Sequence, residues 1–173
     1  PGSGITDFFT RNQVPRSGKG FLGILQLRGT WYEYVSTRLA QPLIPGKHYF
    51  VSFHTSMSDD SNPMQSMGAA FTMNKPIFYT NDQIPIMPQV TSPPDHILND
   101  ADGWMNVCGT FIADQAHEYL TIGFFKSANL SSPYNFTYTG STYYFIDDVI
   151  VSEIPDTCFI TSIPEIDSND DES

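Results

Sequence analysis

Two adjacent carboxylates, Asp147 and Asp148, stand in the middle of an aromatic and aliphatic run from Tyr143 to Val151. The run predicts a β-strand, in which neighbouring side chains point to opposite faces and Asp is disfavoured. One carboxylate is therefore expected to face inward, where an unpaired charge costs several kcal/mol. A cation, an arginine or a set of backbone amides must compensate it.

Calcium is one candidate for that compensation, because it prefers six to eight hard oxygen ligands. Asp7, Asp147 and Asp148 are the predicted ligands, and the loop 59–62 offers further oxygens. The alternative is that Asp147 or Asp148 anchors backbone amides near the N-terminal segment. The sequence leaves both open, since no EF-hand spacing is present.

Carbohydrate recognition is the second chemistry that the residues suit. Sugars stack their C–H surfaces on aromatic rings and bond their hydroxyls to amides, carboxylates and arginine. Trp31 follows a predicted turn at 28–30, so it is expected either at a loop tip or in the core. The predicted ligand-binding residues are Trp31, Tyr34, Arg38, His54, Tyr134 and Tyr138.

A groove for the sugar follows from strand alternation. With Val35, Val51 and Met67 facing the core, the opposite face carries Tyr34, Ser36 and Arg38 beside Phe50, Ser52 and His54. There are two alternatives to a groove on this face: the face is a second interface, or it is covered by the long proline-rich segment 74–103.

An enzymatic role is not favoured. The chain contains no GxSxG, phosphate-loop, HExxH or glycine-rich nucleotide motif, and its four histidines are scattered. Asp59 and Asp148 form a conceivable carboxylate pair for glycoside hydrolysis, but sequence does not give their separation. The residues therefore favour a non-catalytic binding module.

Composition indicates one all-β domain. The chain has 173 residues, 14% aromatic residues, 13 Pro and 12 Gly, so long helices are not expected. The net charge of −11 argues against nucleic acid or an anionic membrane as partner. No apolar run approaches the roughly 20 residues that cross a bilayer, so no direct membrane insertion is expected.

Periodicity predicts seven to nine strands in a two-sheet antiparallel β-sandwich with jelly-roll or Greek-key connections. Residues 32–40 and 48–57 are expected to pair as a hairpin through a tight turn at Ile44–Lys47. The domain spans 20–153, between an irregular segment at 1–19 and an acidic tail or linker at 154–173. The predicted strands are 21–27, 32–40, 48–57, 67–73, 89–91, 104–113, 118–126 and 143–151.

Several motifs occur in an order that resembles one family. They are Pro15–Phe21, Glu33–Val35, Leu39–Gly46, Tyr49–Phe53, Met67–Phe71, Trp104–Phe111, Tyr119–Phe125 and Tyr143–Val151. Together they resemble the jelly-roll, galactose-binding-like or carbohydrate-binding-module-like domains of secreted and surface proteins of Bacteroidota, which accompany gliding, adhesion or outer-membrane-anchoring modules.

The resemblance implies an exported, cell-surface module that binds a glycan or polysaccharide. It also implies an additional first strand, which is expected to be missing here because the chain starts at Pro1. An open sheet edge would then suit other surface-protein chains. The alternative function is therefore a structural or adhesin subunit of a surface assembly or filament. Cys108 and Cys158 are either one disulfide or two buried thiols, and sequence leaves this open.

Overall fold

The structure is a computed structural model, and it describes residues 13–27, 31–59, 61–64, 67–77, 83–93, 96–125, 141–153 and 158. Three predicted site residues, Asp7, Tyr134 and Tyr138, lie outside these ranges. Within the described part of the chain, no helix is long and apolar enough to cross a membrane.

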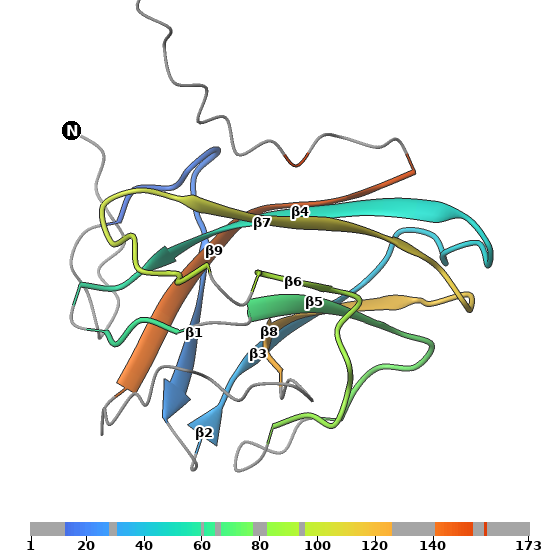
Figure 1. Cartoon of the computed structure of the whole chain (residues 1–173), viewed down its shortest axis with the longest axis horizontal. Coiled ribbons are helices and arrows are strands. Elements are labelled where there is room, and N and C mark those ends of the chain that lie inside the picture. Colours follow the sequence, from blue (N-terminus) through green and yellow to red (C-terminus); the bar gives the residue numbers. More distant parts are fainter. Residues whose placement is uncertain are drawn as a thin grey trace, which may run out of the picture.

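In the part of the chain that the structure describes, nine strands form two antiparallel sheets, whose strands are labelled in Figure 1. Sheet A has the order β2-β1-β9-β4-β7 and sheet B the order β3-β8-β5-β6. The strands of sheet A are β2 (Trp31–Tyr32), β1 (Leu22–Leu27), β9 (Ser141–Ser152), β4 (His48–Met57) and β7 (Met105–Ile112). Those of sheet B are β3 (Tyr34–Arg38), β8 (Tyr119–Phe124), β5 (Met67–Thr72) and β6 (Val90–Thr91).

The predicted jelly roll is confirmed by this strand order. With β2 set aside as a two-residue edge strand, successive strands alternate between the two sheets except at β5 and β6, which are neighbours in sheet B. Each strand pairing in the described part of the chain is antiparallel, as expected for this fold.

The core lies between the sheets and consists of the residues that alternation predicted to face inward. Val51, Phe53, Met67, Ala69 and Phe71 are almost completely buried in one cluster. Val35 packs against the same cluster from β3. Burying a side chain of this size stabilises the fold by about 1.5–3 kcal/mol each.

The predicted hairpin between 32–40 and 48–57 is wrong, although its turn is right. Gly46 has a φ of +83° and the Lys47 amide donates to the Ile44 carbonyl over 3.2 Å, as a turn with Pro45 and Gly46 at its centre requires. However, β3 pairs with β8 and β4 pairs with β7 and β9. The turn therefore belongs to a crossover between sheets, which local turn chemistry does not distinguish from a hairpin.

Two non-strand segments cover the outer faces of the sandwich. The N-terminal strap, defined here as Gln13–Phe21, lies on sheet A: the Gln13 amide donates to Ser56 Oγ (2.5 Å), and Phe21 packs edge-on against Phe145 with centroids 4.9 Å apart. On sheet B, Ile84 from the long loop packs against Ala70 and Phe125. Part of the predicted 74–103 excursion is therefore a cover for a sheet face.

Cys108 and Cys158 form a disulfide, which settles the alternative left open by the sequence. Cys108 lies in β7, and its Cα atom is 5.9 Å from that of Cys158, 50 residues later in the chain. The bond ties a residue beyond the last strand to the edge strand of sheet A.

We expect loss of this disulfide to lower the free energy of unfolding by about 2–4 kcal/mol, because it closes a long loop in the unfolded chain. The measurement is urea unfolding of Cys108→Ser/Cys158→Ser beside the wild type, each with and without dithiothreitol. Reduction should destabilise only the wild type. Equal stability of the double variant and the oxidised wild type would contradict the prediction.

Candidate functional site

A β-bulge in β9 places the two carboxylates. The register between β4 and β9 shifts between Ser52 and His54, and His54 lies opposite Asp147. Asp148 follows with a φ of +49°, a left-handed conformation that Asp tolerates better than most residues. The bulge breaks the alternation on which the inward-facing prediction rested.

Both carboxylates therefore contact the same two residues of the N-terminal strap, and the expectation that one faces the core is wrong. Asp147 Oδ2 accepts the backbone amide of Arg16 (2.9 Å). Asp148 binds the Arg16 guanidinium through one oxygen and the Ser17 hydroxyl through the other. The predicted compensation by an arginine and backbone amides is present on the outer face of sheet A.

The hydrogen-bond donors of the strap also favour the ionised form of the Asp148 carboxyl. Hydrogen bonds from Ser17 and Arg16 lower the pKa of the Asp148 carboxyl, against a smaller opposing effect of burial. A general acid in glycoside hydrolysis needs a raised pKa. A lowered pKa therefore does not suit Asp148 to the role of general acid in the conceivable pair with Asp59.

The predicted calcium ion stays a prediction. All four oxygens of Asp147 and Asp148 accept a hydrogen bond within the chain, so an ion there would share these oxygens with Arg16, Ser17 and the Asp148 amide. Among the described residues, no group of three or more His, Cys, Asp or Glu side chains is arranged to hold a metal. Asp7, the third predicted ligand, lies outside the described ranges.

His54 lies beside this cluster on the outer face of sheet A. Burial lowers its pKa, and the Arg16 charge acts in the same direction, while Asp148 and Asp147 oppose them. Within the described structure, its Nδ1 is buried and has no hydrogen-bond partner. A neutral imidazole packed beside an ion pair is a structural neighbour of the strap and not an exposed sugar contact.

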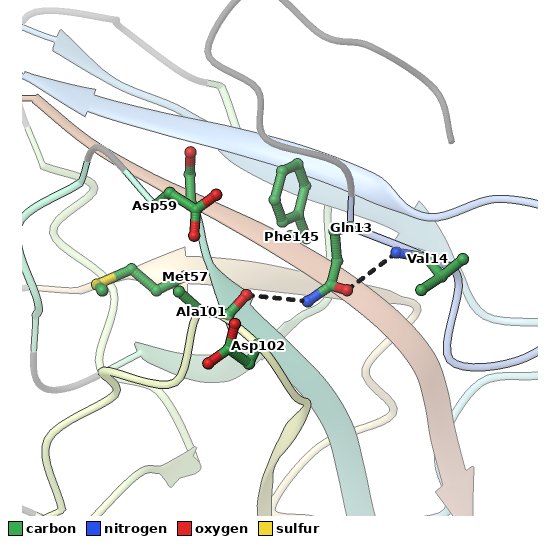
Figure 2. A pocket seen from close by; sticks show the side chains of 8 residues that line it. Gln13, Val14, Met57, Asp59, Ala101, Asp102 and Phe145 are labelled. Atoms are coloured by element: carbon green, nitrogen blue, oxygen red, sulfur yellow. Dashed lines mark hydrogen bonds between the residues drawn. The ribbon is translucent and has the colours of Figure 1, made fainter. Parts of the chain in front are cut away.

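A cleft lies where the strap begins, at the end of β4. It has a volume of about 200 Å³ and is the site drawn in Figure 2. Phe145, Met57 and Val14 give it an apolar side, and Asp59 and Asp102 are exposed around it. The lining residues are Gln13, Val14, Met57, Ser58, Asp59, Ala101, Asp102 and Phe145.

Gln13 connects the N-terminal strap to β4 and to the loop before β7, which line the cleft with it. Its side chain is buried, and its amide nitrogen donates to Ser56 Oγ and to the carbonyls of Ala101 (3.5 Å) and Gly103 (3.4 Å). Its amide oxygen accepts the Val14 backbone N–H over 2.9 Å, and Figure 2 shows the bonds of Gln13 to Ala101 and to Val14. The strap and the loop before β7 therefore form one rigid rim.

Trp31 lies on the same outer face of sheet A as the cleft. It is opposite Leu27 in β1, and the same face continues through Tyr143 to Phe145 in β9. Trp31 is 39% exposed, and its indole N–H donates to Glu33 Oε1 over 3.0 Å. Because Glu33 also accepts the Leu25 amide (2.9 Å), the ring is held in one orientation.

Tyr34 and Arg38 lie on the opposite side of the molecule. Their strand, β3, belongs to sheet B, whereas His54 belongs to sheet A, so the predicted common groove is wrong. The Tyr34 hydroxyl donates to the Phe124 carbonyl (2.9 Å) and accepts the Ile84 amide (3.2 Å), which gives it a structural role. Arg38 is exposed and ion-paired with Glu118 over 2.7 Å.

Sequence reasoning missed the residues that build the cleft. Gln13 and Val14 lie in the segment expected to be irregular, and Ala101 and Asp102 lie at the end of the proline-rich excursion. The one usable signal was the pair of aromatic residues Trp104 and Phe145. Trp104 donates its indole N–H to the Val14 carbonyl (3.1 Å), so it connects the strap to the start of β7.

We expect Asp148→Asn to reduce the acid sensitivity of the fold. Because the folded pKa of Asp148 lies below the ordinary 3.8, its stabilising effect is present above that pH and is lost as pH falls through the folded value. Asn also tolerates the left-handed backbone. The measurement is the melting temperature from neutral pH to about pH 2.

The matched control is Asp102→Asn, which removes an exposed carboxylate that does not contact the strap residues Arg16 and Ser17. At neutral pH only Asp148→Asn should melt earlier than the wild type. The prediction fails when the three proteins lose stability in parallel on acidification.

Comparison with solved structures gives three similar chains, one of which is described here. No family model matches the chain, and no curated protein matches it. A solved structure described as "CBM4 structure and function" superimposes with a TM-score of 0.46 and 15% identity, over 83% of this chain and 90% of that chain. At these values the similarity does not indicate what this chain binds.

Proposed function

We propose that this chain is a non-catalytic glycan-binding module. The observation that carries the proposal is the cleft at the end of β4, because it combines the two surfaces that a sugar needs. Phe145, Met57 and Val14 offer an apolar side for the C–H face of the ring. Asp59 and Asp102 offer carboxylate oxygens for its hydroxyls.

The size of the cleft fits a small part of a glycan. Its volume of about 200 Å³ is below the about 300–1,000 Å³ of most small-molecule pockets. It therefore suits one sugar unit, such as a chain end or a branch. Trp31, held by Glu33 on the same face of sheet A, is a second surface on which a longer glycan could stack.

Export to the cell surface is part of the same proposal. The Cys108–Cys158 disulfide supports it, because such bonds persist in oxidising compartments and are rare in the cytosol. The surface-protein context of Bacteroidota rests on the resemblance of the sequence motifs alone.

A structural or adhesin subunit is the second candidate function, and the edge of β1 favours it. Strand β2 pairs only with Gln26 and Leu27, while Leu22 is 52% exposed and Gly23 is also exposed beyond that pairing. A strand from another surface protein could add to this edge. Multi-angle light scattering separates the two candidates, since a binding module stays monomeric and an assembly subunit associates.

We expect a glycan array to show saturable binding that depends on the cleft. Asp102→Ala should weaken binding by about tenfold or more, because hydrogen bonds to a charged group are worth about 1.5–3 kcal/mol. Trp31→Ala should weaken binding of long glycans. Isothermal titration calorimetry with the strongest array hit gives the dissociation constants.

Two exposed charges elsewhere supply the controls. Arg38→Ala changes the outer face of sheet B, and Asp114→Ala changes the far end of β7 from the cleft. Both should bind like the wild type. Absence of binding on the array, in calcium and in EDTA alike, would reject the glycan proposal and favour the assembly subunit.

A further inference from the structure

Strand β7 is the outermost strand of sheet A, and only β4 pairs with it in the described part of the chain. In an antiparallel pair, a strand bonds to its neighbour through alternate residues. The Ala113 N–H donates to the Lys47 carbonyl (3.0 Å), and the register from there along β7 has no shift, so the odd-numbered residues of β7 bond to β4. The even-numbered residues point their N–H and C=O groups away from β4, and they are Asn106, Cys108, Thr110 and Ile112.

These four residues form an open edge. Within the described structure, none of their backbone groups has a hydrogen-bond partner. Asn106, Thr110 and Ile112 are also exposed. The Cys108 side chain lies on the outer face of the sheet, because its neighbour Val107 is buried in the core. The disulfide therefore starts from that face and not from the edge.

The edges at β1, β3 and β6 are protected in ways that the edge of β7 is not. At β1, the Glu33 carboxylate accepts the Leu25 N–H (2.9 Å), and the Glu33 N–H donates to the Leu25 carbonyl (3.1 Å). Strand β6 has only two residues, and β3 ends in the charged Arg38. The eight residues of β7 include neither a proline nor a charged side chain. A long edge without such protection is a ready template for another strand.

The charges around β7 indicate which strand fits. Asp102 precedes β7 and Asp114 follows it, and both side chains are exposed. The hydrogen bond with His117 lowers the pKa of the Asp114 carboxyl, so this group is ionised at neutral pH. Lys47, near the end of β7, is ion-paired with Glu153 over 2.7 Å. The edge is therefore neutral along its length and acidic at both ends, which is complementary to a neutral strand with basic ends.

A second copy of this chain is less suited to the edge. Two copies of β7 related by a twofold axis would pair antiparallel, and Asp102 of one copy would then lie near Asp114 of the other. Like charges placed close together are unfavourable. The net charge of −11 on each copy adds to the repulsion.

We propose that the open edge of β7 binds an extended segment of another protein as an additional strand of sheet A, uncharged in its centre and with lysine or arginine at both ends. In this mode of recognition, main-chain hydrogen bonds supply the affinity and side chains the selectivity. The inference does not rest on the proposed glycan binding, because it depends on the backbone of β7, although Asp102 belongs to both surfaces.

The test measures hydrogen exchange of single backbone amides by NMR in the whole, oxidised chain. Without a ligand, the amides of Asn106, Cys108, Thr110 and Ile112 should exchange fast, and those of Val107, Gly109 and Phe111 slowly, because only the latter bond to β4. The probe is the peptide acetyl-Lys-Lys-Thr-Val-Thr-Val-Thr-Lys-Lys-amide. With about nine-tenths of the chain bound, exchange at the four edge amides should slow by about tenfold.

The charge preference is tested with the same peptide carrying Glu in place of each Lys. It should bind at least about tenfold more weakly, and this difference should shrink at high salt. The double variant Asp102→Asn/Asp114→Asn should bind both peptides with similar affinity. Titration of the amide resonances of β7 gives the dissociation constants.

A proline in the edge supplies the variant that blocks the new strand. Thr110→Pro removes an N–H that does not bond to β4, and it places the ring in the path of the peptide. It should weaken peptide binding by about tenfold or more. Thr110→Val keeps this N–H and should bind like the wild type. The exchange pattern of the wild type decides the question should Thr110→Pro fail to fold.

Three results would overturn the inference. They are slow exchange of the four edge amides in the free chain, no protection by the Lys-flanked peptide at about 1 mM, and equal affinity of folded Thr110→Pro and the wild type. Protection that grows with protein concentration in the absence of peptide would assign the edge to a second copy and overturn the partner proposed here. None of these results bears on glycan binding by the cleft.

Discussion

The contact between the β9 carboxylates and the N-terminal strap is the interaction on which the rest of sheet A depends. Asp147 and Asp148 bind Arg16 and Ser17, and this fixes the strap midway between its two other attachments, Gln13 and Phe21. The outer face of β9 carries aromatic side chains as well as carboxylates, so without this cover it would expose a hydrophobic patch. The charged contact therefore holds the strap in place over the aromatic side chains of β9.

The bulge explains how two neighbouring carboxylates can serve one purpose. In a regular strand they would point to opposite faces, and one would need a partner in the core. The left-handed conformation of Asp148 costs roughly 1–2 kcal/mol, but it keeps both charges on the outer face of the sheet. That cost is small beside the penalty for an unpaired carboxylate in the interior.

Sequence predicted the fold well because the strands carry strong local signals. Alternation placed Val51, Phe53 and Phe71 in the core, and the Pro45–Gly46 turn was recognised from its residue types. The pairing of β3 with β8 was missed, since residues about 85 positions apart leave no local pattern. The predicted common groove was wrong for the same reason, because alternation gives the face of each strand but not the sheet to which the strand belongs. The bulge and the Gln13 contacts are likewise tertiary features.

The cleft follows from how a jelly roll must be covered. A strap that crosses a sheet face must satisfy its own polar groups: the Gln13 side-chain amide donates to Ser56 Oγ of β4, and its oxygen accepts the Val14 N–H. Where it begins, next to the loops after β4 and before β7, a gap remains that the strap does not fill. The cleft is therefore a consequence of where the strap begins, and its lining combines side chains of the strap, of β4 and β9, and of the loops after β4 and before β7.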